Sequence, residues 1–304
     1  MNRKRMKRNN SKKNNNKMNN DEKISLKLPR DTRQLLNDNI ENIGLKLNKY
    51  IKFVEKKGKE EVQKRTNNGM FRLSSAQKKL LDQITIRNRK MIIELQQAGY
   101  EIKTALFKPL WRMTIGLGVP SVRETSMLFH HIYGIPYIPA SMIKGVVRNY
   151  IITEKFRGGD QKAEEAALQD EGFCDIFGCP KNSVYKESRQ GKIIFFDAFP
   201  IDPVNIEWDI MNVHYQKYYN GNEYPTDSQN PNPVFFLTIK DTQFYFVIGI
   251  KRENEKIKSG VFAGEKILDL TFDYLKETLE NYGLGAKTAV GYGFMKEENL
   301  ENFL

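Results

Sequence analysis

Residues 283–293 read GLGAKTAVGYG, two Gly-x-Gly units that flank one lysine and one threonine. Glycines at this spacing allow tight turns and leave backbone N–H groups accessible, because no Cβ blocks the approach of a ligand. Lys287 adds a point charge that suits a phosphate group. The stretch therefore predicts an anion-binding loop, although a glycine-rich helix stop followed by a hairpin turn gives the same pattern.

The position of this loop narrows the class of anion. An amphipathic helix is predicted over 262–281 and a closing strand over 287–295, so the glycines follow the last helix. A P-loop places Gly-Lys-Ser/Thr at the start of a helix, and a dinucleotide fingerprint follows the first strand. The loop fits neither motif, which favours a nucleic-acid backbone as the anion.

The composition indicates a folded protein of a reducing compartment. The 304 residues are 39% hydrophobic, and they contain no run of about 18 uncharged apolar residues that would span a membrane. The basic start lacks the apolar region of a secretory signal, and two cysteines do not make a disulfide framework. We expect a cytoplasmic protein with no membrane partner.

The net charge of +12 is concentrated at the N-terminus. Residues 1–20 hold eight basic residues and no acidic one, which leaves +4 for the rest of the chain. Non-specific attraction to nucleic acid would come mainly from this segment, whereas the folded body would need locally placed groups to hold a polyanion. A solubilising low-complexity tail is the alternative.

The chain divides into three segments. Residues 1–30 are a basic, Asn-rich tail that we expect to be disordered. Residues 31–99 predict a helical extension, with one helix over 31–57 and a second that begins at Ser74 or Ser75 and ends at Gln97 before Gly99. The two helices have the pattern of an amphipathic hairpin packed on its own domain or on a partner.

Residues 100–304 predict an α+β domain. The first half of the domain is expected to contain a strand over 101–118, a helix after Pro139, a charged helix around 161–170 and a strand over 192–199. The second half is expected to contain strands over 235–240 and 244–251, the 262–281 helix and the closing strand. We expect the 235–240 and 244–251 strands to pair with each other. Residues 200–232 form an insertion, either a long loop or a projecting hairpin. Without insertions this order is the ferredoxin-like, RRM-like split βαβ arrangement, an antiparallel sheet with both helices on one face.

A second informative segment is Ile138–Arg148. Pro139 fixes the entry to a helix, and Ser141 is expected to cap that helix or to bond a phosphate oxygen. Lys144 and Arg148 lie four residues apart on one helix face, close to the partial positive charge of the helix start. This arrangement predicts an anion site, and a solvated basic face is the alternative.

Taken together, three motifs carry a family resemblance. They are similar to motifs of the RAMP superfamily of CRISPR proteins, and the resemblance covers about residues 100–304. The three motifs are Pro-x-Ser-x-x-Lys-Gly-x-x-Arg over 139–148, Ile176-Phe177-Gly178 with the strand after Gly191, and the late Gly-x-Gly-x5-Gly-x-Gly. More narrowly, residues 116–118, 124–126, 130–139, 214–219 and 233–236 resemble the family of sixth, head-end subunits of the type III-B Cmr effector complex. Met142 departs from this family, where many members carry a second serine.

The resemblance implies an RNA-binding subunit. Its partners would be the 3′ portion of the guide RNA (crRNA), the target single-stranded RNA, and neighbouring Cmr subunits, namely the backbone RAMP, the small helical and the head RAMP subunits. The implied RNA contacts are Ser141, Lys144, Arg148, Gly283, Gly285, Lys287, Thr288, Gly291 and Gly293. N–H groups and cations of this kind read phosphates rather than bases, which leaves guide bases free to pair.

Further candidates lie outside these motifs. Three arginines near the same edge are further candidate cations, although for each one singly an ordinary surface role is favoured: Arg112, Arg123 and Arg189. The insertion contains flat side chains that either stack on a displaced base or anchor the loop to the body: His214, Tyr215, Tyr218 and Tyr219.

We expect no catalysis and no cofactor. The competing hypothesis is a metal-independent endoribonuclease that processes guide RNA through His130 or His214. His130 lies in a half-apolar run beside His131, a pattern that favours a structural role. Asp197, Asp202 and Asp227 do not form an evident metal site, because Asp197 is expected in a buried strand, and Cys174 and Cys179 lack a second ligand pair for zinc.

Overall fold

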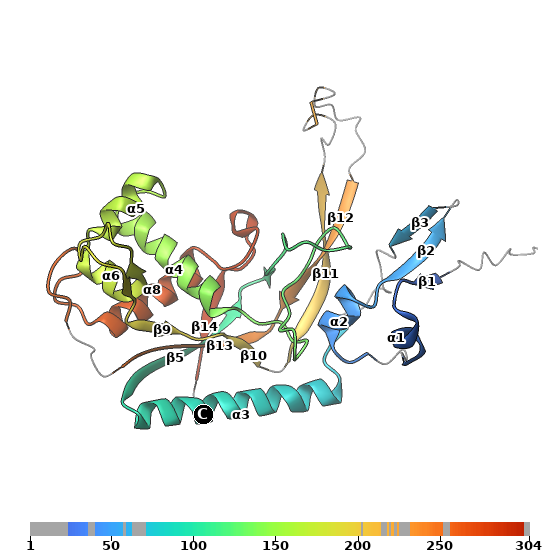
Figure 1. The fold of residues 1–304 in the computed structure, drawn as a ribbon, viewed down its shortest axis with the longest axis horizontal. Coiled ribbons are helices and arrows are strands. Elements are labelled where there is room, and N and C mark those ends of the chain that lie inside the picture. Colours follow the sequence, from blue (N-terminus) through green and yellow to red (C-terminus); the bar gives the residue numbers. More distant parts are fainter. Residues whose placement is uncertain are drawn as a thin grey trace, which may run out of the picture.

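A five-stranded antiparallel sheet lies at the centre of the computed structural model (Figure 1). The structure describes residues 24–35, 40–56, 59–62, 71–201, 203–213, 218, 220–221, 224, 232–251 and 256–300. The strands run in the order β10 (Phe199–Ile201), β13 (Gln243–Lys251), β5 (Tyr100–Pro109) and β14 (Met295–Glu298), and β9 (Ile193–Phe195) also pairs with β13. The α+β class and the antiparallel pairing are confirmed.

Helices cover both faces of this sheet (Figure 1). One face carries α4 (Ala140–Lys155), α5 (Gln161–Leu168), α6 (Glu171–Phe177) and α8 (Ile267–Asn281). Between α6 and β9 lies a short pair of strands, β7 (Gly178–Cys179) and β8 (Arg189–Gln190). The other face carries α3 (Ser75–Gln97), which contacts β5 and β10.

Successive side chains on the central strands point alternately toward these two helical layers. Phe107 of β5 and Phe246 of β13 face the main core under α4 and α8, with their ring centroids 5.8 Å apart. Leu106 and Val247 point the other way and pack with Ile92 of α3. Since successive residues of a strand point to opposite faces, a period of two is what a sheet buried on both sides requires.

Of the two alternatives for the 200–232 insertion, a long loop or a projecting hairpin, the pairing of β11 with β12 fits the hairpin. The pairing predicted for 235–251 is wrong. β12 (Asn232–Lys240) pairs along its length with β11 (Asn205–Val213), and β4 (Phe71–Arg72) and β6 (Arg112–Met113) complete a second sheet. β12 and β13 follow each other across a short turn but belong to different sheets. At this turn Asp241 has a φ of 49°, and Thr242 bonds back to Asn205, which redirects the chain.

The N-terminal extension is less helical than predicted. Instead of one helix over 31–57, the structure has α1 (Arg30–Leu35), α2 (Ile43–Asn48), and a three-stranded sheet of β1 (Ile24–Leu26), β2 (Lys52–Lys56) and β3 (Lys59–Val62). Asn42 caps α2, and the aromatic and β-branched residues after Tyr50 favour a strand. Local β-propensity and strand pairing therefore override the apparent helical period.

The second predicted helix of the extension is confirmed. Ser74 accepts a hydrogen bond from the Gln77 N–H, the Gln77 side chain bonds back to Ser74, and α3 ends at Gln97. Leu81 and Ile84 are buried in the main core, so α3 packs on its own domain. By contrast Ile86 and Ile93 are exposed.

Several predicted boundaries shift. The 101–118 strand divides into β5 and β6, and the 192–199 strand divides into β9 and β10 around an exposed bend at Asp197. The last helix begins at Ile267, and the closing strand begins only at Met295, because residues 288–290 form a 3-10 turn. Such turns are common where a chain reverses after a helix.

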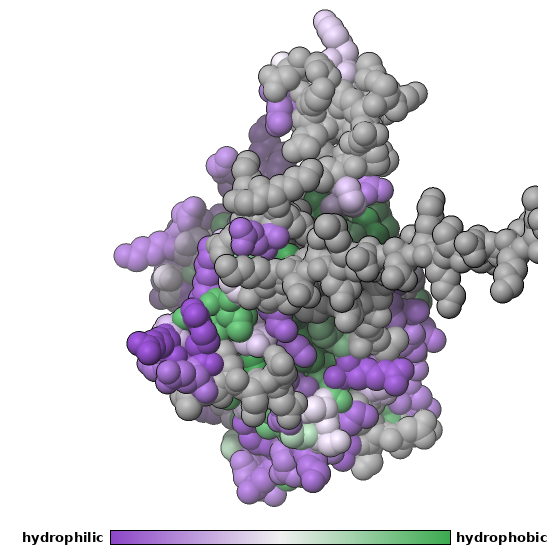
Figure 2. Space-filling model, turned by 90° about the vertical axis from the view of Figure 1, so that its right-hand side faces the viewer, coloured by the Kyte–Doolittle hydropathy of each residue, from purple (hydrophilic) through white to green (hydrophobic). Residues whose placement is uncertain are grey.

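The described surface is mainly hydrophilic when seen from the side of the N-terminal extension (Figure 2). Within the ranges that the structure describes, no helix combines the length and the apolar content needed to cross a membrane.

The docking of α3 can be tested with two isoleucines of the same helix. We expect Ile84→Ala to lower the free energy of unfolding by about 2–5 kcal/mol, because the Ile84 side chain is buried and the substitution leaves a cavity. Ile86→Ala, at a 56% exposed site, is expected to change it by less than about 0.5 kcal/mol. Chemical denaturation of both variants measures the difference, and equal effects would contradict the packing of α3 on the sheet.

Candidate nucleic-acid interface

Backbone hydrogen bonds lock the glycine-rich loop into the domain. The Leu284 N–H donates to the Gly293 carbonyl at 2.9 Å, which closes the loop on itself. The Gly293 N–H donates to the Arg112 carbonyl at 2.8 Å, and the Ala286 N–H donates to the Thr114 carbonyl at 2.9 Å. The loop is therefore a fixed extension of the β6 edge.

Two of its glycines are required by this packing. Gly285 and Gly293 have φ values of 102° and 78°, in the region that favours glycine. A Cβ at Gly285 would collide with the Thr114 carbonyl, and a Cβ at Gly293 would collide with the Leu284 carbonyl. Gly283 and Gly293 are buried, so they shape the loop and present no surface to a ligand.

The outer part of the loop is accessible. Gly285 and Gly291 are exposed, and Lys287 and Thr288 are half-buried. Within the described ranges, the backbone N–H groups of Gly285, Lys287 and Thr288 have no acceptor. The Lys287 ammonium lies 5.7 Å from the centroid of the Phe236 ring and forms no ion pair with a described residue. This part keeps donors and one cation available for an anion.

The start of α4 does not have the predicted cap. The N-cap residue is Pro139, Ser141 is exposed and caps nothing, and the Ala140 N–H donates to Asp197 Oδ1 at 2.7 Å. Asp197 lies in an exposed bend, not in the buried strand predicted for it. Its carboxylate already compensates the positive end of the helix, so that end does not attract a phosphate as strongly as predicted.

The two cations of α4 that are predicted to bind an anion have different surroundings. Arg148 donates from Nη2 to Glu164 Oε1 at 2.7 Å and lies 5.2 Å from the centroid of the Phe173 ring. Lys144 is half-buried, and no acidic side chain among the described residues pairs with it. Burial, and then the Arg148 charge, lower the pKa of Lys144. Of the predicted pair, Lys144 is therefore the cation that no described carboxylate neutralises.

A direct contact connects α4 with the start of the loop. Asn149 Nδ2 donates to the Tyr282 hydroxyl at 2.8 Å, and Tyr282 immediately precedes Gly283. Ser141, Gly145 and Asn149 are exposed at four-residue spacing, so they share one face of α4. In Figure 1 the chain after α8 rises on the same side of the sheet as α4. The structure thus places both motifs on one side of the molecule.

The three further arginines make internal contacts. Arg112 pairs with Glu207 at 3.0 Å and with Asp209 at 3.3 Å, and its side chain is 18% exposed. Arg123 donates from Nε to the Leu47 carbonyl at 3.0 Å. Arg189 lies 3.4 Å from Glu187 Oε1. These contacts favour a structural role for Arg112 and Arg123.

Sequence reasoning missed the network that supports the loop from below. The Tyr292 hydroxyl donates to Asp209 Oδ2 at 2.9 Å, and the same carboxylate pairs with Arg112. Burial and the Asp209 carboxylate raise the pKa of Tyr292 to about 12. No sequence signal reveals this network, because its members lie far apart in the sequence and come from two strands of the second sheet and from the glycine-rich loop.

His130 belongs to an aromatic cluster rather than to an acid–base pair. Its ring stacks on Tyr133 with centroids 4.2 Å apart, and Tyr137 and Phe199 lie within 6 Å. Contrary to the expectation for adjacent residues, the His131 ring also stacks on it at 5.3 Å. Burial, the largest cause, lowers the pKa of His130, which favours the uncharged ring.

Other predicted site residues fall partly outside the described ranges. His214, Tyr215, Tyr219, Asp202 and Asp227 lie outside them, as do residues 1–23 of the basic tail. The disorder predicted for the rest of the 1–30 tail is wrong, because Ile24–Leu26 form β1 and pair with β2. Tyr218 is described and is 49% exposed. In the part of the chain that is described, no group of three His, Cys, Asp or Glu side chains is arranged to hold a metal ion.

Two glycine substitutions test whether the loop depends on its backbone geometry. We expect Gly293→Ala to lower the free energy of unfolding by about 2–3 kcal/mol, because alanine disfavours the positive φ and meets the Leu284 carbonyl. Gly145→Ala is the control. It lies in a helix with open space around it, and we expect stabilisation by about 0.5–1 kcal/mol. Thermal denaturation measures the stability of both variants. A Gly293→Ala variant that is as stable as the wild type would argue against the locked loop.

Comparisons with known proteins agree with this architecture. The model of the RAMP superfamily matches residues 101–296. The CRISPR system Cmr subunit Cmr6 of Pyrococcus furiosus is 33% identical over 64% of this chain and 67% of its own length. Cmr6 of Saccharolobus solfataricus is 32% identical over 59% of this chain and 50% of its own length. A chain in a solved structure of type III-B Cmr-β bound to cognate target RNA is 27% identical over 70% of this chain and 65% of that chain, with a TM-score of 0.49.

The extent of these matches settles the family. The superfamily model covers more than half of the chain, and the Pyrococcus protein is 33% identical over 67% of its own length. The chain therefore belongs to the RAMP superfamily and, within it, to the Cmr6 subunits of CRISPR Cmr systems.

Proposed function

We propose that this chain is a non-catalytic RNA-binding subunit of a type III-B Cmr ribonucleoprotein, in which it holds the 3′ portion of the guide RNA and faces the target RNA in antiviral defence. The observation that carries the proposal is the contact between α4 and the start of the glycine-rich loop, in a member of the Cmr6 family. The related chain from a Cmr particle bound to cognate target RNA is consistent with this role.

The accessible groups suit the RNA backbone rather than the bases. Lys144 and Lys287 offer cations that no described carboxylate neutralises, and the loop offers unpaired N–H groups. Ser141 and Thr288 add hydroxyls beside them. Arg148 keeps donors that Glu164 does not use. Cations, N–H groups and hydroxyls of this kind bind phosphates without regard to sequence, as a guide strand requires.

The position of α3 supports an RNA interface away from the open face of the sheet. RNA-recognition modules stack bases on the open face of their four-stranded sheet. Here that face is covered, because Ile92 of α3 packs on Leu106 and Val247. We therefore place the RNA on the opposite side, along α4 and the loop. Exposed flanks would remain for the backbone RAMP, small helical and head RAMP subunits.

The alternative of a metal-independent endoribonuclease has less support. A general base needs an accessible ring nitrogen and a pKa near the working pH. His130 is half-buried among aromatic rings, and its pKa is shifted downward. Its neighbour Asp197, the candidate orienting group, is already engaged by the Ala140 N–H. A structural role accounts for each of these contacts.

The backbone-binding proposal can be tested with Lys144→Ala. We expect the affinity for single-stranded RNA to fall roughly fivefold and the slope of log K against log salt to decrease by about 1, because one phosphate contact is lost. Fluorescence anisotropy with two RNAs of unrelated sequence measures both quantities. The loss should be the same for both RNAs.

Lys79→Ala is the matched control for this test. Lys79 is exposed on α3, on the covered side of the sheet, and its removal changes the net charge by the same amount. We expect an affinity within about twofold of the wild type. Equal losses for Lys144→Ala and Lys79→Ala, or a loss confined to one RNA sequence, would refute the proposed interface.

The absence of catalysis is tested separately. We expect purified protein to leave end-labelled guide RNA intact in the presence of a chelator, because His130, the described candidate base, is half-buried among aromatic rings and its pKa is lowered. Denaturing electrophoresis of a time course measures cleavage. Turnover that disappears in His130→Ala would establish the endoribonuclease instead.

A further inference from the structure

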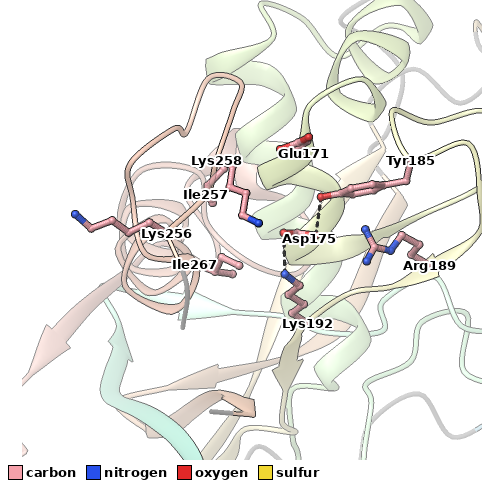
Figure 3. Close-up of a pocket in the computed structure, with 9 residues that line it drawn as sticks. All are labelled: Glu171, Asp175, Tyr185, Arg189, Lys192, Lys256, Ile257, Lys258 and Ile267. Carbon is pink, nitrogen blue, oxygen red and sulfur yellow. Dashed lines mark hydrogen bonds and ion pairs between the residues drawn. The ribbon is translucent and has the colours of Figure 1, made fainter. Parts of the chain in front are cut away.

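A cationic pocket lies on the flank of the domain formed by α6, β8, β9 and the segment before α8 (Figure 3). Its volume is about 250 Å³. Four cations line it, Arg189, Lys192, Lys256 and Lys258, against two carboxylates, Glu171 and Asp175. The pocket shares none of its lining residues with α4 or with the glycine-rich loop, so it is separate from the proposed RNA interface.

Three of the cations converge on one carboxylate. In Figure 3 the side chains of Lys192, Lys258 and Arg189 point toward Asp175, whereas Lys256 points away. Asp175 accepts hydrogen bonds from Lys192 Nζ at 3.0 Å and from the Tyr185 hydroxyl at 3.0 Å, and its side chain is 13% exposed. Two internal donors therefore satisfy Asp175 without Lys258 or Arg189.

The two remaining inward cations are weakly compensated. Lys258 is exposed and forms no ion pair with a described residue. Arg189 lies 4.0 Å above the Tyr185 ring, which holds the guanidinium plane at the pocket wall. Its partner Glu187 has a side chain that is 66% exposed, and ion pairs to such exposed carboxylates are weak. The six charged lining residues give an excess of two positive charges, one of which belongs to Lys256, the cation that points away.

We propose that this pocket binds a phosphomonoester, the terminal phosphate of a phosphorylated sugar or of an RNA end. A phosphomonoester carries a charge of about −1.5 to −2 at pH 7, and Arg189 and Lys258, the two inward cations that Asp175 does not bind, can neutralise it. Arg189 can bond two phosphate oxygens through its planar fork, and Lys192 and Lys258 add point charges.

The size of the cavity supports a terminal group. A volume of about 250 Å³ lies just below the usual range of roughly 300–1,000 Å³ for pockets that enclose drug-sized ligands. It admits a phosphate with one sugar. A continuous nucleic-acid backbone instead needs a groove that tracks several nucleotides.

The experiment is a calorimetric titration of the full-length protein with ribose 5-phosphate and, separately, with ribose. We expect saturable binding of ribose 5-phosphate and none of ribose. Lys258→Gln is expected to weaken the binding about tenfold and to leave the melting temperature unchanged, because Lys258 forms no hydrogen bond or ion pair with a described residue. Lys79→Gln on α3, the control for net charge, should bind like the wild type.

A second arm identifies the source of the phosphate. RNA with a 5′-phosphate is compared with the same RNA carrying a 5′-hydroxyl, in the wild type and in Lys258→Gln. A preference for the phosphorylated RNA that Lys258→Gln removes assigns the pocket to an RNA end, and its absence assigns the pocket to small phosphorylated sugars. If ribose 5-phosphate fails to bind at about 10 mM, or if Lys258→Gln binds it like the wild type, the proposal is wrong. Neither result depends on Lys144.

Discussion

The closure of the glycine-rich loop on β6 is the constraint on which the rest of this structure depends. Gly293 bonds to Arg112, and Ala286 bonds to Thr114, so the chain between α8 and β14 is fixed to the edge of the second sheet. The side chain of Arg112 in turn holds Glu207 and Asp209 of β11. One short segment thus connects the central sheet with the projecting hairpin, and only glycine tolerates the close backbone approach at positions 285 and 293.

Internal ion pairs and hydrogen bonds determine which charged groups remain for a ligand. Most of the predicted cationic surface is neutralised within the protein, because Asp197 occupies the start of α4, Glu164 pairs with Arg148, and two carboxylates hold Arg112. A buried or half-buried charge is costly unless it is paired, so most such groups acquire partners during folding. The unpaired cations beside the outer loop are therefore a better guide to RNA binding than the net charge of the chain.

The two proposed anion sites lie on different parts of the molecule. Along α4 and the loop, donors lie on an open surface that suits a continuous strand. On the α6 flank, cations converge in a cavity of about 250 Å³ that suits the end of a molecule. The covering of the other sheet face by α3 leaves these two surfaces, and not the sheet itself, for polyanions. A subunit built in this way can hold RNA without using the sheet face of RNA-recognition modules.

The sequence by itself determined the α+β class, the capped helix that ends at Gln97, and the two motifs on α4 and the late loop, because each depends on local spacing and on residue type. It did not determine the pairing of β12 with β11 rather than with β13, or the strands that replace the first predicted helix, since register and partner are chosen by burial across the whole domain. Only the tertiary structure decided which charges are free. Asp197, Glu164 and Asp209 come from distant positions to meet their partners, and no local pattern encodes such meetings.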